Sequence, residues 1–153
     1  MKGATPHSPI SHLSTSQGLH PMLKFKFLLW AFAQLLKRQI HRNADCARYV
    51  QAKRLVFQIR TVAGAGRTFV IEDGAIRSFA GLTQDAQFTF CFKDAAKGFA
   101  ILSAKDSQTA FIRGLGSKDL TISGDFRDVA WFQGLTAFLQ PAKVVSPYNR
   151  TAF

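Results

Sequence analysis

The chain has 153 residues, of which 47% are apolar, so it can form one domain with a sizeable hydrophobic core and is not a disordered protein. Its net charge is +11, but residues 22–60 hold nine basic residues and one acid, whereas residues 61–153 hold ten and eight. An anionic partner is therefore expected near the N-terminal part of the chain.

The two ends of the chain are predicted to lie outside the folded part. Residues 1–21 are rich in Ser, His, Pro and Gly without a sustained period, which is typical of a disordered leader. Residues 142–153 follow Pro141 and are predicted to form a C-terminal tail. Between these ends we expect a basic amphipathic helical arm at 22–50 and a folded domain at 51–141.

A helix is predicted from Leu23 to Ile40, because apolar residues recur there at helical spacing. One stripe of this helix collects Leu28, Leu29, Phe32, Leu35, Leu36 and Ile40. The simplest interpretation is that the stripe packs on the core of the domain. Basic residues on both sides of the apolar run also fit a helix that lies in an anionic membrane surface, and the two interpretations can coexist. The predicted membrane contacts are Lys24, Lys26, Phe27, Trp30, Lys37 and Arg38.

This helix fits neither a membrane span nor a secretion signal. A span takes about 20 mainly apolar residues, and the run here is shorter and interrupted. Ala31 and Ala33 could mark a cleavage site, but the apolar region before them is short. Two cysteines, Cys46 and Cys91, fit a reducing compartment without a disulfide framework. We therefore expect a cytoplasmic protein, peripheral on the membrane if the helix binds there.

The middle of the chain has the period-two pattern and turn residues of a β-sheet. The expected strands lie at 55–60, 69–71, 75–79 and 86–92, with turns at 64–66 and 73–74. Side chains alternate between the two faces of a strand, so the fourth strand places Phe88, Phe90 and Phe92 on one face.

Aspartates mark the starts of the predicted helices that follow. Asp94 can cap a helix that runs through Ala104, and Asp106 can cap a shorter one. The next segment, RGLGSKD at 113–119, is predicted to be a loop because of its two glycines.

A last strand and a last helix complete the pattern. Leu120 and Ile122 alternate with polar residues in a strand at 120–123, and Asp125 caps a helix that ends near Pro141. Strands and helices mix without a regular βα repeat. This predicts an α+β fold with about five strands, mainly antiparallel, and helices packed on one face.

The end of this pattern resembles the sterol carrier protein type 2 family. The matching residues are Ala110 and Phe111, Gly114, the segment from Leu120 to Asp125 and the helix at 128–139. The likeness covers about residues 54–139. It implies that 51–141 is a lipid-binding domain with an apolar cavity between sheet and helices. Some bacterial relatives in that family are thought to be accessory factors in isoprenoid quinone synthesis.

The resemblance also implies where a ligand would lie. It would contact the phenylalanine face of the sheet and the helices that cover it. The predicted ligand-binding residues are Phe88, Phe90, Phe92, Phe99, Leu102, Phe111, Ile122, Trp131, Leu135 and Phe138. The residue pattern alone favours a filled core, because a phenylalanine stripe more often packs than binds.

No catalytic residue, cofactor or metal site is predicted. The chain has no G-x-S-x-G motif or phosphate-binding loop, and its His, Cys, Asp and Glu residues lack metal-ligand spacing. A pairing of Cys91 with His41 is not expected, because a thiol inside a strand is normally inert.

The predicted function is non-enzymatic binding or carriage of a hydrophobic ligand: a fatty acyl chain, a sterol-like molecule, a phospholipid or an isoprenoid quinone precursor. An alternative is an accessory module that docks on an enzyme of lipid or quinone synthesis. A less favoured alternative is a nucleic-acid-binding protein, because the basic residues lie beside an apolar run and no known nucleic-acid module fits.

Overall fold

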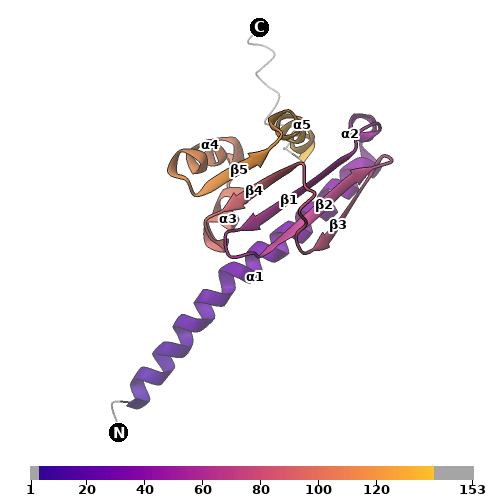
Figure 1. The fold of residues 1–153 in the computed structure, drawn as a ribbon. Helices are drawn as coiled ribbons and strands as arrows, with labels where there is room; N and C mark the ends of the chain where they lie inside the picture. The colour runs from indigo at the N-terminus through magenta and orange to yellow at the C-terminus, as the bar shows by residue number, and fades with distance from the viewer. Residues whose placement is uncertain (1–3, 140–153) are drawn as a thin grey trace, which may run out of the picture.

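The computed structural model describes residues 4–139, and it places the side chains of residues 21–139. A five-stranded sheet is covered by helices (Figure 1). The elements in chain order are α1 (Ala4–Arg42), α2 (Ala44–Val50), β1 (Leu55–Thr61), β2 (Gly66–Glu72), β3 (Ala75–Ala80), β4 (Phe88–Phe92), α3 (Ala95–Leu102), α4 (Ser107–Ser117), β5 (Leu120–Gly124), α5 (Phe126–Thr136) and a 3₁₀ turn, η1 (Ala137–Leu139).

The sheet has the strand order β3-β2-β1-β4-β5. All neighbouring strands are antiparallel except β1 and β4, which are parallel. Phe57 on β1 lies opposite Phe69 on β2 and Phe88 on β4, so aromatic side chains share one face across three strands. We call this the Phe face and the opposite side the outer face. The predicted α+β fold with a mainly antiparallel sheet is confirmed.

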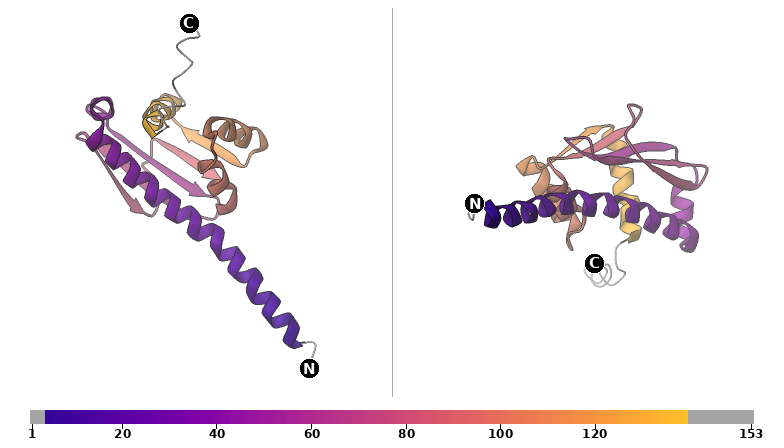
Figure 2. Two further views of the ribbon diagram at one scale, coloured as in Figure 1. Left: turned by 180° about the vertical axis from the view of Figure 1, so that it is seen from behind. Right: turned by 90° about the horizontal axis from the view of Figure 1, so that it is seen from below.

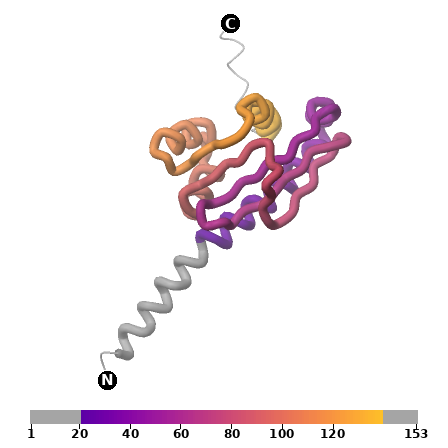
Figure 3. Tube along the Cα trace, in the orientation of Figure 1, coloured from indigo at the N-terminus to yellow at the C-terminus, as the bar shows by residue number. Residues whose placement is uncertain are grey.

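The connection from β3 to β4 crosses the outer face of the sheet, as the trace in Figure 3 shows. The Thr83 backbone N–H donates to Gln58 Oε1 at 2.9 Å, and the Thr68 hydroxyl donates to the Gly81 carbonyl at 2.8 Å. Gln58 Nε2 also donates to Thr89 Oγ1 at 3.0 Å. These bonds satisfy Gln58 and Thr68, two polar side chains that are buried beneath the loop.

Helix α1 lies across the Phe face (Figure 2). Its buried residues are Phe25, Leu29, Ala33 and Leu36. The predicted stripe is therefore partly wrong: Leu35 is exposed, and Phe25 is buried instead. The reason is a non-local fit, because the Phe25 ring packs against Gly98 of α3 and lies 6.1 Å from the Phe92 ring.

The helical arm differs from its predicted bounds at both ends. Helix α1 begins at Ala4, so most of the segment predicted as a disordered leader has a helical backbone. Helix growth is cooperative, and a helix anchored on the sheet can extend toward the N-terminus at one hydrogen bond per added residue. At the other end Asn43 interrupts the helix, because its side chain caps α2 by accepting from the backbone N–H groups of Asp45 and Cys46.

The predicted loop at 113–119 is also wrong. Helix α4 continues to Ser117 and ends where Lys118 adopts a left-handed conformation, φ 68°. Gly114 is needed for packing, since an added Cβ would lie 2.7 Å from Ile101 Cδ1. The predicted N-caps Asp94, Asp106 and Asp125 are confirmed, each accepting a backbone N–H bond from the helix it starts. The predicted tail at 142–153 lies outside the described residues.

Candidate functional site

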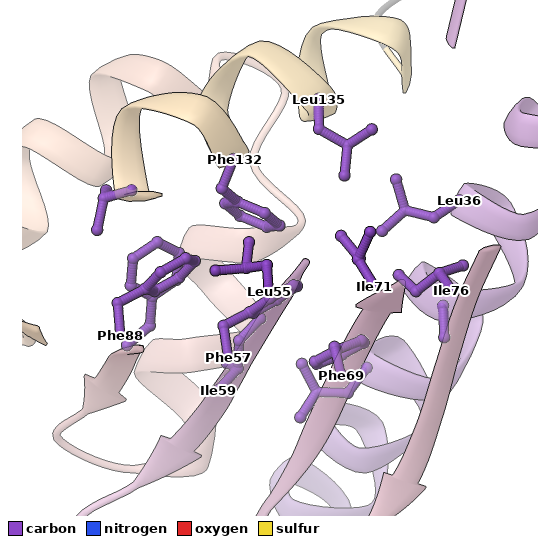
Figure 4. Packing of buried hydrophobic residues seen from close by; sticks show 14 of the residues in the cluster. Leu36, Leu55, Phe57, Ile59, Phe69, Ile71, Ile76, Phe88, Phe132 and Leu135 are labelled. Carbon is purple, nitrogen blue, oxygen red and sulfur yellow. The ribbon is translucent and has the colours of Figure 1, made fainter. Parts of the chain in front are cut away.

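Seven phenylalanines form one cluster between the sheet and the helices. This phenylalanine cluster consists of Phe32, Phe57, Phe69, Phe88, Phe90, Phe111 and Phe132. Phe132 of α5 points into its middle, with its ring centroid 4.6 Å from that of Phe57 and 5.6 Å from those of Phe88 and Phe90 (Figure 4). The cluster is an entirely hydrocarbon layer that contains no titratable side chain.

Strand register explains how the rings on the sheet are arranged. Phe57 lies between its register partners Phe69 and Phe88, at 4.8 and 5.0 Å, with interplanar angles of 7° and 10°. Neighbouring strands lie about 4.8 Å apart, so rings on directly opposed residues stack. The three rings therefore form a stack that runs from strand to strand across the sheet, and the Phe132 ring is tilted relative to the Phe57 ring at its centre.

The predicted ligand-binding residues separate into several environments. Phe88, Phe90 and Phe111 belong to the phenylalanine cluster, Leu135 is buried beside it, and Ile122 is the register partner of Phe90. Leu102 packs at the edge of the core. The remaining four lie elsewhere: Phe92 against Phe25, Phe99 beneath the Lys24 ammonium, and Trp131 and Phe138 against Tyr49.

The predicted ligand-binding residues did not include four members of the cluster: Phe32, Phe57, Phe69 and Phe132. Phe32 belongs instead to the helical stripe that the sequence predicts to pack on the core. Phe57 and Phe69 have the same strand parity as their buried neighbours, so strand pairing could have identified them. Phe132 follows Trp131 directly, and helical periodicity alone did not show which of the two faces the sheet.

The rings of the cluster are in direct contact at these separations. Among the hollows at the surface of residues 21–139, two have volumes of about 300 and 320 Å³. No residue of the phenylalanine cluster lines either one. A ligand that enters the layer must therefore move side chains or a helix.

Helix α5 is held over the layer by contacts with Tyr49 of α2 and with Lys53, which follows α2. The Tyr49 ring stacks on Trp131 at 4.9 Å, and its hydroxyl donates to the Trp131 carbonyl at 2.7 Å. Lys53 Nζ lies 2.8 Å from Asp128 Oδ1 and 5.1 Å from the centre of the Trp131 ring. Burial raises the pKa of Tyr49, so its hydroxyl stays protonated as a donor. We call this group of four residues the α2–α5 latch.

The opposite side of α1 carries large apolar side chains in solvent. Leu23, Phe27 and Trp30 are 61%, 65% and 45% exposed, and they follow one another at helical spacing. We call them the exposed α1 stripe. Basic residues flank it on both sides, namely Lys24, Lys26, Lys37 and Arg38, and residues 21–42 contain no acid. Among the described helices, none is both long enough and apolar enough to span a bilayer.

The described part of the chain has few groups suited to metal binding or thiol chemistry. No three His, Cys, Asp or Glu side chains among these residues come together as a possible metal site. Burial raises the pKa of the Cys46 thiol, which disfavours the reactive thiolate. Cys91 alternates with the phenylalanines of β4 and so belongs to the outer face.

Neither a protein-family model nor a curated protein sequence matches the chain. A solved structure described as a UbiJ-SCP2 ubiquinone synthesis protein is similar, with a TM-score of 0.52 and 16% identity over 72% of this chain and 94% of that one. The chain has a sterol carrier protein type 2 fold.

Two further structures are similar to this sterol carrier fold. A conserved hypothetical protein of Thermus thermophilus, described as a candidate sterol carrier protein, has a TM-score of 0.47 and 20% identity over 71% of this chain and 81% of that one. Apo sterol carrier protein 2 of Yarrowia lipolytica has a TM-score of 0.45 and 15% identity over 74% and 93%. The resemblance predicted from the sequence is confirmed at the level of the fold.

Proposed function

We propose that this protein binds or carries a hydrophobic ligand within the aromatic layer and catalyses no reaction. The observation that carries the proposal is the phenylalanine cluster, which fills the space between sheet and helices with hydrocarbon alone. Burial of an acyl chain in such surroundings is worth about 0.8 kcal/mol for each CH₂ group. Useful affinity therefore needs no polar contact, and the layer offers no group for acid–base or nucleophilic chemistry.

The ligand classes to be tested follow from shape and chemistry: a fatty acyl chain, a sterol-like molecule, a phospholipid or an isoprenoid quinone precursor. The name of the UbiJ-SCP2 protein assigns that protein to ubiquinone synthesis. Similarity in fold to that protein supports including quinone precursors among the ligands. All four classes share an extended apolar part that could replace ring-to-ring contacts in the layer.

We further propose that the ligand enters by displacement of α5. Phe132 closes the middle of the layer, and α5 joins β5 through Gly124, whose φ of 110° is easily adopted only by glycine. Movement of α5 about this residue would lift Phe132 away from Phe57, Phe88 and Phe90. The α2–α5 latch opposes this movement through one ion pair, one hydrogen bond and one stacked ring pair.

Titration of the full chain with a fluorescent fatty acid tests the proposal, with native mass spectrometry to count bound molecules. Phe90→Trp adds bulk inside the layer and should weaken uptake. Phe79→Trp is the matched control, because Phe79 is 48% exposed and its register partner Thr68 lies on the outer face. No uptake of fatty acid, sterol or quinone analogues by the unmodified protein would contradict the proposal.

The exposed α1 stripe supports a second part of the proposed function, docking on an anionic membrane surface. Its apolar side chains could enter the headgroup region while the flanking lysines meet anionic lipids. Deletion of residues 1–40 is a poor test, because Phe25, Leu29, Ala33 and Leu36 belong to the core.

The better test of docking is the double variant Phe27→Ser, Trp30→Ser, compared with Phe79→Ser, in flotation with vesicles of phosphatidylcholine with and without phosphatidylglycerol. We expect the double variant alone to lose binding to the anionic vesicles. Equal vesicle binding by the unmodified protein, the double variant and Phe79→Ser would contradict docking through α1. Tighter, salt-sensitive binding to oligonucleotides than to vesicles would instead favour the nucleic-acid alternative.

An accessory role beside a biosynthetic enzyme is a second candidate function. The observation in its favour is a further exposed apolar pair on α4, Ile112 and Leu115, one turn apart. A protein partner that dissociates on Ile112→Ser, Leu115→Ser while vesicle binding is unchanged would support this role.

A further inference from the structure

A surface hollow of about 300 Å³ lies where α1 passes the β1–β2 turn and the end of β3. The residues that line it are Lys26, Leu29, Gly64, Ala65, Gly66, Arg67, Ala80 and Gly81. Gly64 and Gly81 both have positive φ, which favours glycine at these two positions, and a Cβ at either one would meet no atom within 4 Å.

The charged residues that line the hollow are all positive. Lys26 comes from α1 and Arg67 from β2, and its lining contains no acid. Among residues 21–139, no carboxylate lies within 4.0 Å of either cation, whereas Lys53, Arg54, Arg77 and Lys97 all have acidic partners. Two positively charged residues therefore line one hollow and have no carboxylate partner among these residues.

Arg67 is held in place for an external ligand. Its Nε donates to Ser78 Oγ at 2.9 Å, which fixes one edge of the guanidinium group. Its terminal nitrogens have no hydrogen-bond acceptor in the part of the chain with described side chains. A guanidinium group with two free terminal nitrogens suits bidentate recognition of an oxyanion, and a lysine adds a mobile point charge.

We propose that this hollow binds the phosphate group of a phosphate ester. Two cations without an acid match a phosphate monoester, which carries a charge of about −1.5 to −2 at neutral pH, better than a singly charged carboxylate. The rest of the lining is uncharged, with Leu29, Ala65 and Ala80 contributing apolar surface. The expected ligand is therefore a phosphate monoester with an uncharged remainder, as in the headgroup of phosphatidic acid or in a soluble phosphate monoester.

The position of the hollow is compatible with a lipid source. Lys26 precedes Phe27 directly and Trp30 by four residues, so the hollow adjoins the exposed α1 stripe. A lipid in contact with the docked exposed α1 stripe would present its phosphate close to Lys26. Binding of a soluble ester at this hollow does not require membrane docking. Neither a soluble ester nor a lipid phosphate requires ligand uptake by the phenylalanine cluster.

The test compares Lys26→Gln and Arg67→Gln with Lys105→Gln. Lys105 is a matched control, because it is an exposed lysine outside α1, its substitution removes the same charge, and it does not line the hollow. One arm measures binding of glycerol 3-phosphate to each full-length protein by calorimetry. The other measures binding to vesicles of phosphatidylcholine mixed with phosphatidic acid.

We expect Lys26→Gln and Arg67→Gln to weaken binding about tenfold, as for loss of a hydrogen bond to a charged group, and Lys105→Gln to weaken it much less. This difference in the calorimetric arm identifies a soluble ester as a ligand, and the same difference in the vesicle arm alone identifies a lipid headgroup. Equal effects of all three substitutions in both arms, or no binding in either arm, would overturn the proposal.

Discussion

Phe132 is the side chain on which the sheet and helix layers meet. Its ring is nearly fully buried and contacts Phe32, Phe57, Phe88 and Phe90. Phe132→Ala should lower the free energy of unfolding by about 3–5 kcal/mol, because it removes these contacts and leaves a void. Urea denaturation measures the loss, and Phe79→Ala on the outer face should cost far less. Similar losses of unfolding free energy for Phe132→Ala and Phe79→Ala would show that packing in the layer contributes no more to stability than the outer face does.

Asp106 and Asp125 link stability to pH at the residue scale. The Thr109 hydroxyl and backbone N–H lower the pKa of Asp106, and the Arg127 backbone N–H lowers the pKa of Asp125. A lowered folded-state pKa contributes stability above the unfolded value of about 3.9, which is lost as pH falls through the folded-state pKa.

Asn can keep both N-caps but cannot titrate. The double variant Asp106→Asn, Asp125→Asn should therefore have a flatter dependence of the urea midpoint on pH below about 4 than the unmodified protein. Denaturation curves across the acidic range measure this. An unchanged slope would mean that these caps make no contribution to acid sensitivity.

Two helical glycines differ in their surroundings: Gly98 is closely packed against α1, whereas Gly116 has free space beside it. A Cβ on Gly98 of α3 would lie 2.6 Å from Phe25 Cε1, so Gly98→Ala should destabilise by about 1–3 kcal/mol through overpacking against α1. A Cβ on Gly116 of α4 would meet nothing within 4 Å, so Gly116→Ala should stabilise by roughly 0.5–1 kcal/mol. Thermal unfolding of both variants measures the two signs, and shifts of the same sign would contradict this packing.

The elements that sequence reasoning predicted correctly are those with local causes. Strand alternation in β1 and β4, the Asp73 and Gly74 turn, and the three aspartate caps depend on residues close together in the chain. Gly114 and Gly116 of α4 indicate a loop when only their neighbours in sequence are considered. The close contact of Gly114 with Ile101 of another helix is distant in sequence, so the local pattern does not contain it.

The candidate site was predictable for its strands but only in part for its helices, since Phe111 and Leu135 were among the predicted residues and Phe132 was not. Period-two alternation placed Phe88 and Phe90 on the buried face correctly. The choice between Trp131 and Phe132 on α5 depended on where α2 lies, since Tyr49 and Lys53 hold Trp131 outside the cluster. No periodicity within α5 contains that information.

Charge is distributed unevenly over the whole molecule, and this sets the expected salt dependence. The exposed α1 stripe is flanked by four basic side chains on a segment without an acid. Binding to anionic vesicles should therefore weaken as salt rises, because the screening length is only about 8 Å at physiological ionic strength. Flotation across a salt series measures this. Binding that is indifferent to salt would show that the apolar side chains act alone.

The connection that crosses the outer face has a consequence for the order of folding. The antiparallel β1–β2–β3 meander has neighbours close in sequence, whereas β4 reaches β1 only after the chain has passed over that meander. Local pairings close first because their loop entropy is smaller. The meander should therefore form early, and β4, β5 and α5 should join it late. Elements that join late tend to be the least protected in native-state hydrogen exchange. The segment that closes the aromatic layer would then be both the last to fold and the first to open, so ligand exchange would need only local unfolding.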